Sequence, residues 1–291
     1  MSDIFDFANM LHDSYTSTGF VIMFLTITFL FGIAIGSFLN VVILRLPSGE
    51  SIIGIGRSDE EKEKASHCMK CGAKIRPIDL IPVFSWIMLK GRCHSCGEKI
   101  SPRYPIVESL NGLLYVLTFW VLDINVKAII TCLLMSLLIV IAFMDWDTME
   151  IDMRIVGIIL LLAVPLAIFT DDVPLKHRII GALVISVPFF LIGEISRPII
   201  RRKFGEDFRA IELGDTILMF AAGAFLGTQA IIVSTFIGII AAAIGGGIIK
   251  AVTKDSKFAF GPYLAIGIAI GALWGNRLAE MWINYLFSNI Q

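Results

Sequence analysis

Long apolar runs recur along most of this chain, and they constrain its fold more than any other feature. Eight segments are candidate membrane spans: 19–44, 105–122, 126–144, 155–170, 177–195, 216–228, 230–249 and 258–283. A helix needs about 20 apolar residues to cross the hydrocarbon core of a bilayer. In lipid, only helices and closed barrels satisfy every backbone polar group. The sequence therefore predicts an all-α polytopic membrane protein with about eight transmembrane helices.

Composition agrees with this class. The 291 residues are 56% hydrophobic and 17% charged, whereas soluble domains carry about 25% charged residues. The net charge of −1 gives no indication of a nucleic-acid partner. The first eighteen residues lack a basic region, and the apolar run that follows is too long for a signal peptide. We therefore expect a first helix that is retained.

The positions of Lys and Arg predict the orientation in the membrane. With the N-terminus outside, twenty of the twenty-four basic residues fall in the inner segments 45–104, 145–154, 196–215 and 249–257. Three parts are expected: residues 1–44 with the first helix, a cytoplasmic loop domain at 45–104, and a membrane domain at 105–291. The charge run at 58–64 is interpreted as a solvated face of the loop.

Two near-copies of a cysteine knuckle lie in the loop domain. The strings CMKCGAKI and CHSCGEKI carry Cys68, Cys71, Cys93 and Cys96, with the second copy 25 residues after the first. Two CxxC pairs supply four thiolates for a closed tetrahedral site, so we predict a structural zinc ion. His67 and His94 are alternative ligands. Cys132 lies inside the third apolar run and is expected to be a small buried apolar residue.

Acidic residues gather at two edges of the predicted spans. Asp145 directly follows the third span, and Asp215 directly precedes the sixth. In the orientation above both lie at the cytoplasmic boundary, where two carboxyls sharing one proton would suit a two-aspartate peptidase. The alternative is that they are ordinary acids at helix ends, with Asp215 capping the sixth helix. These residues alone do not separate the two interpretations.

Several further stretches stand in order along the chain. They read Gly36-Ser-Phe-Leu-Asn-Val-Val-Ile-Leu-Arg-Leu-Pro47, Ile81-Pro-Val-Phe-Ser-Trp86, Ile100-Ser-Pro-Arg-Tyr-Pro-Ile-Val-Glu108 and Phe260-Gly-Pro-Tyr-Leu264. Together with the paired knuckles, they resemble the signatures of the type IV prepilin leader peptidases, a family of GxGD-type membrane aspartyl peptidases. The resemblance runs from about residue 32 to residue 275, which is nearly the whole chain.

The resemblance implies catalytic roles for the two edge aspartates. Asp145 takes the place of the first catalytic aspartate of the family, and Asp215 ends the GxGD motif that carries the second. Asp147 and Asp152 rank below Asp145 for the first role. The chain departs from the family pattern in having Asp152 where a proline is usual and Glu212 in place of the first glycine of GxGD.

The resemblance also implies a function. The substrate is a type IV prepilin or pseudopilin, whose leader is removed at the cytoplasmic face of the bacterial inner membrane. Many members methylate the new N-terminus with S-adenosylmethionine, for which Glu108 is the candidate residue; pairing with Arg103 is its alternative.

A peptidase without methyltransferase activity and a transporter with a zinc-stabilised loop are the other functions considered. Three roles are considered for the basic residues at 201–203: setting the membrane topology, contacting anionic lipid headgroups, and contacting acidic positions of the substrate.

Overall fold

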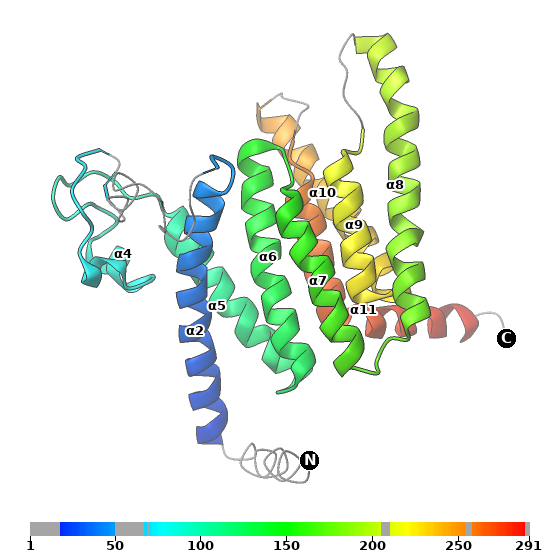
Figure 1. The fold of residues 1–291 in the computed structure, drawn as a ribbon, viewed down its shortest axis with the longest axis horizontal. Helices are drawn as coiled ribbons and strands as arrows, with labels where there is room; N and C mark the ends of the chain where they lie inside the picture. The colour runs from blue at the N-terminus through cyan, green and yellow to red at the C-terminus, as the bar shows by residue number, and fades with distance from the viewer. Residues whose placement is uncertain (1–17, 50–66, 69, 205–209, 254–257, 289–291) are drawn as a thin grey trace. The chain divides into compact units, whose positions relative to one another are not determined.

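The computed structural model describes residues 18–49, 67–68, 70–204, 210–253 and 258–288. Those residues form helices and loops, and two isolated β-bridges join extended residues within the loops. The elements are α2 (Thr18–Arg45), η1 (Pro77–Leu80), α4 (Phe84–Met88), α5 (Arg103–Leu122), α6 (Val126–Thr148), α7 (Met153–Phe169), α8 (Leu175–Phe204), α9 (Leu213–Leu226), α10 (Thr228–Thr253) and α11 (Gly261–Ser288) (Figure 1). The predicted all-α fold is confirmed. The charge run at 58–64 lies outside the described residues.

Each of the eight predicted apolar runs forms a helix. Five of the helices, α2, α5, α6, α8 and α10, are long and apolar enough to cross a membrane. Helices α7 and α9 are apolar but hold only 17 and 14 residues. Helix α11 carries Arg277 and Glu280 in its second half, and its last turns, red in Figure 1, run across the neighbouring helices of the bundle. Helices α7 and α9 are thus shorter than a typical membrane-spanning helix, and α11 differs from one in carrying two charged residues.

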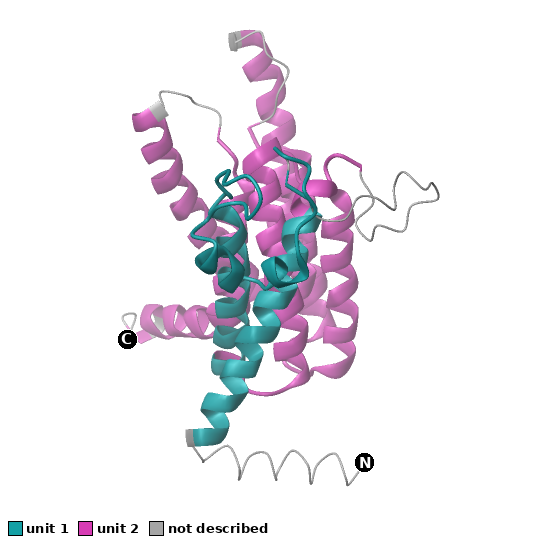
Figure 2. Ribbon diagram, turned by 90° about the vertical axis from the view of Figure 1, so that its left-hand side faces the viewer, with its two compact units in different colours: residues 1–42, 51–120 teal, residues 43–50, 121–291 magenta. Residues whose placement is uncertain are grey.

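Contacts divide the chain into two compact units, coloured separately in Figure 2. Unit 1 comprises residues 1–42 and 51–120, and unit 2 comprises residues 43–50 and 121–291. Most of α2, the cysteine loop and α5 thus belong to unit 1, and helices α6 to α11 belong to unit 2. The functional division at 44/45 and 104/105 is a different kind of boundary and stays a prediction.

Helices α2 and α5 of unit 1 approach closely at two glycines. A Cβ atom on Gly32 would lie 2.7 Å from the Cα atom of Gly112. Asn111 donates a hydrogen bond of 2.7 Å to the carbonyl of Gly32, and Asn40 donates one of 3.2 Å to the carbonyl of Tyr104. Small residues bring the backbones together and the amide side chains then join them, as is typical of helices packed in a membrane.

The helices of unit 2 pack on one another in the same way. Helix α9 lies against α8 and α7, and α11 lies against α10 and α6. A Cβ atom on Gly181 of α8 would lie 2.7 Å from the carbonyl oxygen of Gly223 in α9, and one on Gly238 of α10 would lie 3.2 Å from that of Tyr263 in α11. Glycines therefore allow close contact between α8 and α9 and between α10 and α11. This packing determines where the ends of α6, α9 and α11 meet.

Candidate functional site

Asp145 and Asp215 come together in unit 2. Asp145 lies in the last turn of α6 and is 5% exposed, while Asp215 lies in the first turn of α9 and is 6% exposed. The charge of the Asp145 carboxylate acts directly on that of Asp215. Two buried carboxyls, 70 positions apart in the sequence, therefore lie close enough for the charge of Asp145 to reach Asp215. Such a pair is suited to holding one shared proton.

The local structure positions each aspartate. Helix α6 ends at Thr148 because Met149 adopts the left-handed conformation (φ 55°), and its N–H bonds to the carbonyl of Asp145. The N-cap of α9 is Glu212, so Asp215 sits inside the first turn. Asp215 is therefore not the N-cap residue, although its carboxylate accepts a hydrogen bond from the N–H of Glu212 and so also helps to cap the helix. A Cβ atom on Gly214 would lie 3.0 Å from Cβ of Ile151, so this glycine brings α9 close to the segment that follows Asp145.

The other acidic residues near Asp145 are placed differently. Asp147 is exposed. Asp152 is the N-cap of α7, where its carboxylate accepts a hydrogen bond of 2.8 Å from the N–H of Arg154. The Arg154 side chain also bonds to this carboxylate and lowers the pKa of Asp152 below its ordinary value of 3.8. Burial and coupling to Asp215 thus distinguish Asp145 from both competitors.

Asp145 also contacts a third part of the chain. The backbone N–H of Gly261, the first residue of α11, donates a hydrogen bond of 2.8 Å to Oδ2 of Asp145. Sequence reasoning singled out the string Phe260-Gly-Pro-Tyr-Leu264 but assigned it no role. No local signal could have found this contact, because its partners are 116 positions apart.

The four cysteines of the two knuckles gather in unit 1. The Sγ atoms of Cys68, Cys71, Cys93 and Cys96 all lie within 4.8 Å of one another, so the group could hold a metal ion. The Sγ atoms of Cys68 and Cys96 are 3.8 Å apart. Zinc–sulfur bonds of about 2.3 Å in a tetrahedron would place sulfur atoms about 3.8 Å apart. The donor set and its spacing therefore fit a zinc ion.

The sequence repeat is also a structural repeat. In the first knuckle the N–H of Gly72 bonds to the carbonyl of Cys68 at 2.9 Å, and in the second the N–H of Gly97 bonds to that of Cys93 at 3.0 Å. Both glycines have a positive φ, 69° and 73°, which favours glycine at the tight turn. The β-bridges His67–Lys74 and Arg92–Lys99 hold equivalent places in the two copies.

Further contacts favour metal binding by the cluster. An ion pair between Lys70 and Glu98 joins the two knuckles. The backbone N–H groups of Cys71 and Lys70 lower the pKa of the Cys68 thiol to about 6, whereas burial and the neighbouring cysteines raise the pKa of Cys96 to about 12. Cys132 is buried inside α6 and is absent from this group. Its predicted role as a small buried residue is confirmed.

Glu108 lies in α5 and is 7% exposed. Its Oε2 accepts a hydrogen bond of 2.7 Å from the backbone N–H of Val83, and the Ser37 hydroxyl also bonds to the carboxylate. Val83 has a φ of 62°, which is rare for a β-branched residue. Glu108 therefore holds the strained turn of the Ile81–Trp86 stretch against α5.

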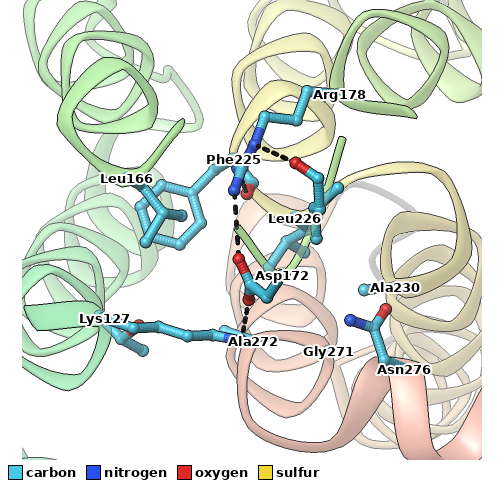
Figure 3. A pocket seen from close by; sticks show the side chains of 12 residues that line it. Lys127, Leu166, Asp172, Arg178, Phe225, Leu226, Ala230, Gly271, Ala272 and Asn276 are labelled. Atoms are coloured by element: carbon cyan, nitrogen blue, oxygen red, sulfur yellow. Dashed lines mark hydrogen bonds and ion pairs between the residues drawn. The ribbon is translucent and has the colours of Figure 1, made fainter. Parts of the chain in front are cut away.

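A second cluster of charges lies at the other end of the unit 2 helices. Figure 3 shows the Asp172 carboxylate between the side chains of Arg178 and Lys127, with which it forms ion pairs. A cavity of about 20 Å³ lies beside the cluster, which is room for about one water molecule. Lys127 and Asp145 are 18 positions apart on α6, or about 27 Å along a helix. This cavity is therefore separate from the aspartate pair.

Comparison with known proteins adds to this description. The sequence matches the Bacterial Peptidase A24 N-terminal domain over residues 30–122 and the Type IV leader peptidase family over residues 132–247. It is 30% identical over 271 residues to the prepilin leader peptidase/N-methyltransferase of Pseudomonas putida, covering 88% of this chain and 92% of the relative. Its identity to the protein of that name from Aeromonas salmonicida (strain A449) is 31% over 281 residues, covering 90% and 94%. No solved structure matches the chain.

Proposed function

The chain belongs to the type IV leader peptidase family, and on that premise we propose that it removes the leader peptide from type IV prepilins or pseudopilins, with Asp145 and Asp215 as the catalytic pair. The observation that carries this proposal is the meeting of two buried carboxyls from α6 and α9. Their burial and their coupling support a shared proton, which the chemistry requires.

The pair performs the hydrolysis in two proton transfers. One carboxyl is ionised and takes a proton from water, whose oxygen attacks the carbonyl carbon of the scissile peptide bond. The other carboxyl is protonated, so it donates a hydrogen bond to the carbonyl oxygen. When the tetrahedral intermediate collapses, the C–N bond breaks and this second carboxyl gives its proton to the leaving nitrogen. The pair then again holds one proton, with the roles of the two carboxyls exchanged.

The protein is placed in the bacterial inner membrane with its N-terminus outside and the cysteine loop in the cytoplasm. The distribution of Lys and Arg supports this orientation. Two of the four basic residues on the outer side, Lys127 and Arg178, are paired with Asp172. The substrate leader then stays in the cytoplasm, and its bond to the mature protein reaches Asp145 and Asp215 at the inner boundary.

Membrane lipid is a partner of the end of α8. This helix has 30 residues, or about 45 Å at 1.5 Å per residue, whereas the hydrocarbon core is about 30 Å thick. Arg201 and Arg202 are exposed in its final turns. In the proposed orientation these two residues reach the anionic headgroups of the inner leaflet.

A zinc ion held by Cys68, Cys71, Cys93 and Cys96 stabilises the cytoplasmic loop. Sulfur atoms within 4.8 Å of one another support this assignment. Four cysteine ligands would leave a zinc ion no position for substrate, so its contribution would be to the folding of the loop. The loop contains no β-sheet or large helical core in its described residues, and the metal takes the place of one.

N-methylation of the new amino terminus with S-adenosylmethionine is the second proposed activity, in keeping with the names of the relatives. The cofactor supplies the methyl group when it is bound. A carboxylate accepts up to about four hydrogen bonds, so Glu108, bonded to Val83 and Ser37, keeps capacity for a cationic amine or a ribose hydroxyl. Glu108 is therefore assigned to the cofactor site.

The peptidase is tested by co-expression with a tagged prepilin, comparing the wild-type protein with Asp145→Asn and Asp215→Asn. Each variant should accumulate in the membrane and leave the leader uncut. Asp147→Asn is the matched control, because Asp147 is exposed two positions from Asp145, and it should process normally. Full processing by either dyad variant would remove that residue from the catalytic pair.

Methylation is tested separately, by mass spectrometry of the processed terminus. Glu108→Gln keeps an oxygen that can accept from Val83 but loses the charge, whereas Glu108→Ala loses both. Glu108→Gln should cleave normally and leave the terminus unmethylated. If Glu108→Gln methylates normally and only Glu108→Ala does not, Glu108 has only a structural role, as the acceptor of the hydrogen bond from the Val83 N–H.

A further inference from the structure

Gly261 is the residue that holds the Asp145 carboxylate in place. Its N–H donates a hydrogen bond of 2.8 Å to Oδ2 of Asp145, and both residues are buried. This bond fixes the orientation of the carboxylate, and with it the directions in which its remaining lone pairs accept hydrogen bonds. The first residue of α11 thereby determines how the Asp145 carboxylate is oriented.

A side chain at this position would displace the Asp145 carboxylate. A Cβ atom on Gly261 would lie 2.8 Å from Oδ2, 2.9 Å from Cγ and 3.1 Å from Cβ of Asp145. Real Cβ atoms essentially never approach a heavy atom within 3.0 Å. Gly261 does not have a positive φ angle, so backbone conformation is not the reason for glycine here. The reason is the space that the Asp145 carboxylate occupies.

The helix that carries Gly261 is itself held firmly. The carbonyl of Phe260 accepts hydrogen bonds from the N–H groups of Tyr263, at 3.1 Å, and Leu264, at 3.2 Å, which close the first turn of α11. Leu264 and Ile268 are buried side chains of that helix. The Gly238 backbone of α10 lies against Tyr263 and Leu264. Packing between α10 and α11 thus sets the position of the Gly261 N–H.

We propose that Gly261 is a positioning residue for the proteolytic reaction, which acts by fixing the orientation of the Asp145 carboxylate relative to Asp215. The proposal rests on the catalytic role proposed for Asp145. Gly261 itself reacts with nothing, and its contribution is the hydrogen bond to Oδ2 together with the absence of a side chain. A displaced carboxylate would still lie near Asp215 but would no longer be oriented toward the attacking water.

Steady-state kinetics of the purified protein on a prepilin test the proposal. Gly261→Ala should lower kcat by about 100-fold, the usual cost of displacing a reacting group by about 1 Å. KM should stay unchanged, because Gly261 contacts Asp145 rather than substrate. Gly157→Ala is the matched control, since a Cβ atom there meets nothing within 4 Å, and it should behave as wild type. A wild-type kcat for Gly261→Ala, or a rise in KM alone, would overturn the proposal.

A double-mutant cycle on thermal stability tests the same contact without activity. Gly261→Ala should lower the Tm of the wild-type protein but have little effect in an Asp145→Ala background, where the obstructing carboxylate is gone. An equal fall in Tm in both backgrounds would contradict the proposal. So would a failure of the Gly261→Ala protein to accumulate in both backgrounds. If Asp145→Asn cleaves prepilin normally, the proposed function fails instead, whatever the cycle shows.

Discussion

The guanidinium of Arg178 donates a hydrogen bond of 2.6 Å to the carbonyl of Phe225, so a buried side chain of α8 binds the C-terminal end of α9. Arg178 is 3% exposed and also forms an ion pair with Asp172, at 3.6 Å. Cationic side chains stabilise the free carbonyls and the negative dipole at a helix C-terminus. Asp215 lies at the other end of the same helix, so Arg178 helps to hold the helix that carries half of the proposed catalytic pair.

Replacing this arginine should destabilise the protein. Arg178→Met removes the donors to α9 and leaves buried carbonyls without partners, which should cost about 3 kcal/mol of the free energy of unfolding. The measurement is thermal unfolding in detergent. Lys176→Met is the control, because Lys176 is exposed two positions away. Equal Tm values for the two variants would contradict the role assigned to Arg178.

The close approach of α8 and α9 gives a second prediction. Gly181→Ala would place a Cβ atom 2.7 Å from the carbonyl oxygen of Gly223, so it should separate the helices and destabilise the protein by about 2 kcal/mol. Gly247→Ala is the matched control, because a Cβ atom there meets nothing within 4 Å. It should be neutral or stabilising by up to about 1 kcal/mol, since alanine favours helix. The measurements are the Tm and the cleavage rate of both variants. Equal Tm values for Gly181→Ala and Gly247→Ala would contradict the prediction.

Asp152 should contribute to stability and not to cleavage. Asp152→Ala removes the N-cap of α7 and should cost about 1 kcal/mol, whereas Asp152→Asn keeps a capping oxygen. The pKa of Asp152 is below its ordinary 3.8 because of Arg154. Its charge-dependent stabilisation is therefore present above pH 3.8 and is lost as the pH falls through the lower folded value. Unfolding curves at several pH values should show this loss in wild type and not in Asp152→Asn.

Cleavage assays of the Asp152 variants separate its two possible roles. Both Asp152→Asn and Asp152→Ala should process prepilin at the wild-type rate, provided the protein is folded. Loss of cleavage in a stable Asp152→Asn protein would place Asp152 in the catalytic pair in place of Asp145.

Zinc content tests the cysteine cluster. The wild-type protein should carry about one zinc ion per chain. Cys71→Ser and Cys96→Ser should each lower that content and make the loop sensitive to protease. Cys132→Ala changes the one cysteine outside the cluster, and it should leave zinc content unchanged. Metal analysis of the purified proteins is the measurement, and unchanged zinc in Cys71→Ser would refute the site.

Hydropathy and spacing were enough to predict most of the elements. The eight apolar runs all became helices, and the two CxxC knuckles met as one group of four sulfur atoms. Both are local properties of the sequence, because a span depends on consecutive residues and a knuckle on two cysteines three positions apart. The predicted ends were less accurate: α6 runs to Thr148 where the run was expected to end at 144, since Asp145 and Asp147 continue the helix.

The choice among the acidic residues needed both kinds of information. Motif resemblance favoured Asp145 and Asp215 but left Asp147 and Asp152 as competitors and left Asp215 with a capping alternative. Only the fold showed that Asp152 is occupied at the start of α7 and that Glu212, not Asp215, is the N-cap of α9. The sequence alone does not distinguish an aspartate that caps a helix from one that faces solvent or one that is buried beside another carboxyl.

By itself the sequence determined that the apolar runs form helices, that four cysteines are spaced for one metal-binding group, and which string carries each candidate aspartate. The tertiary structure decided which groups touch: Gly261 with Asp145, Val83 with Glu108, and Arg178 with Phe225. The difference has a physical cause. Hydropathy and ligand spacing act over a few neighbouring residues, whereas these contacts depend on how helices with similar apolar surfaces pack. That packing is set by small residues such as Gly181 and Gly238, whose partners lie far along the chain.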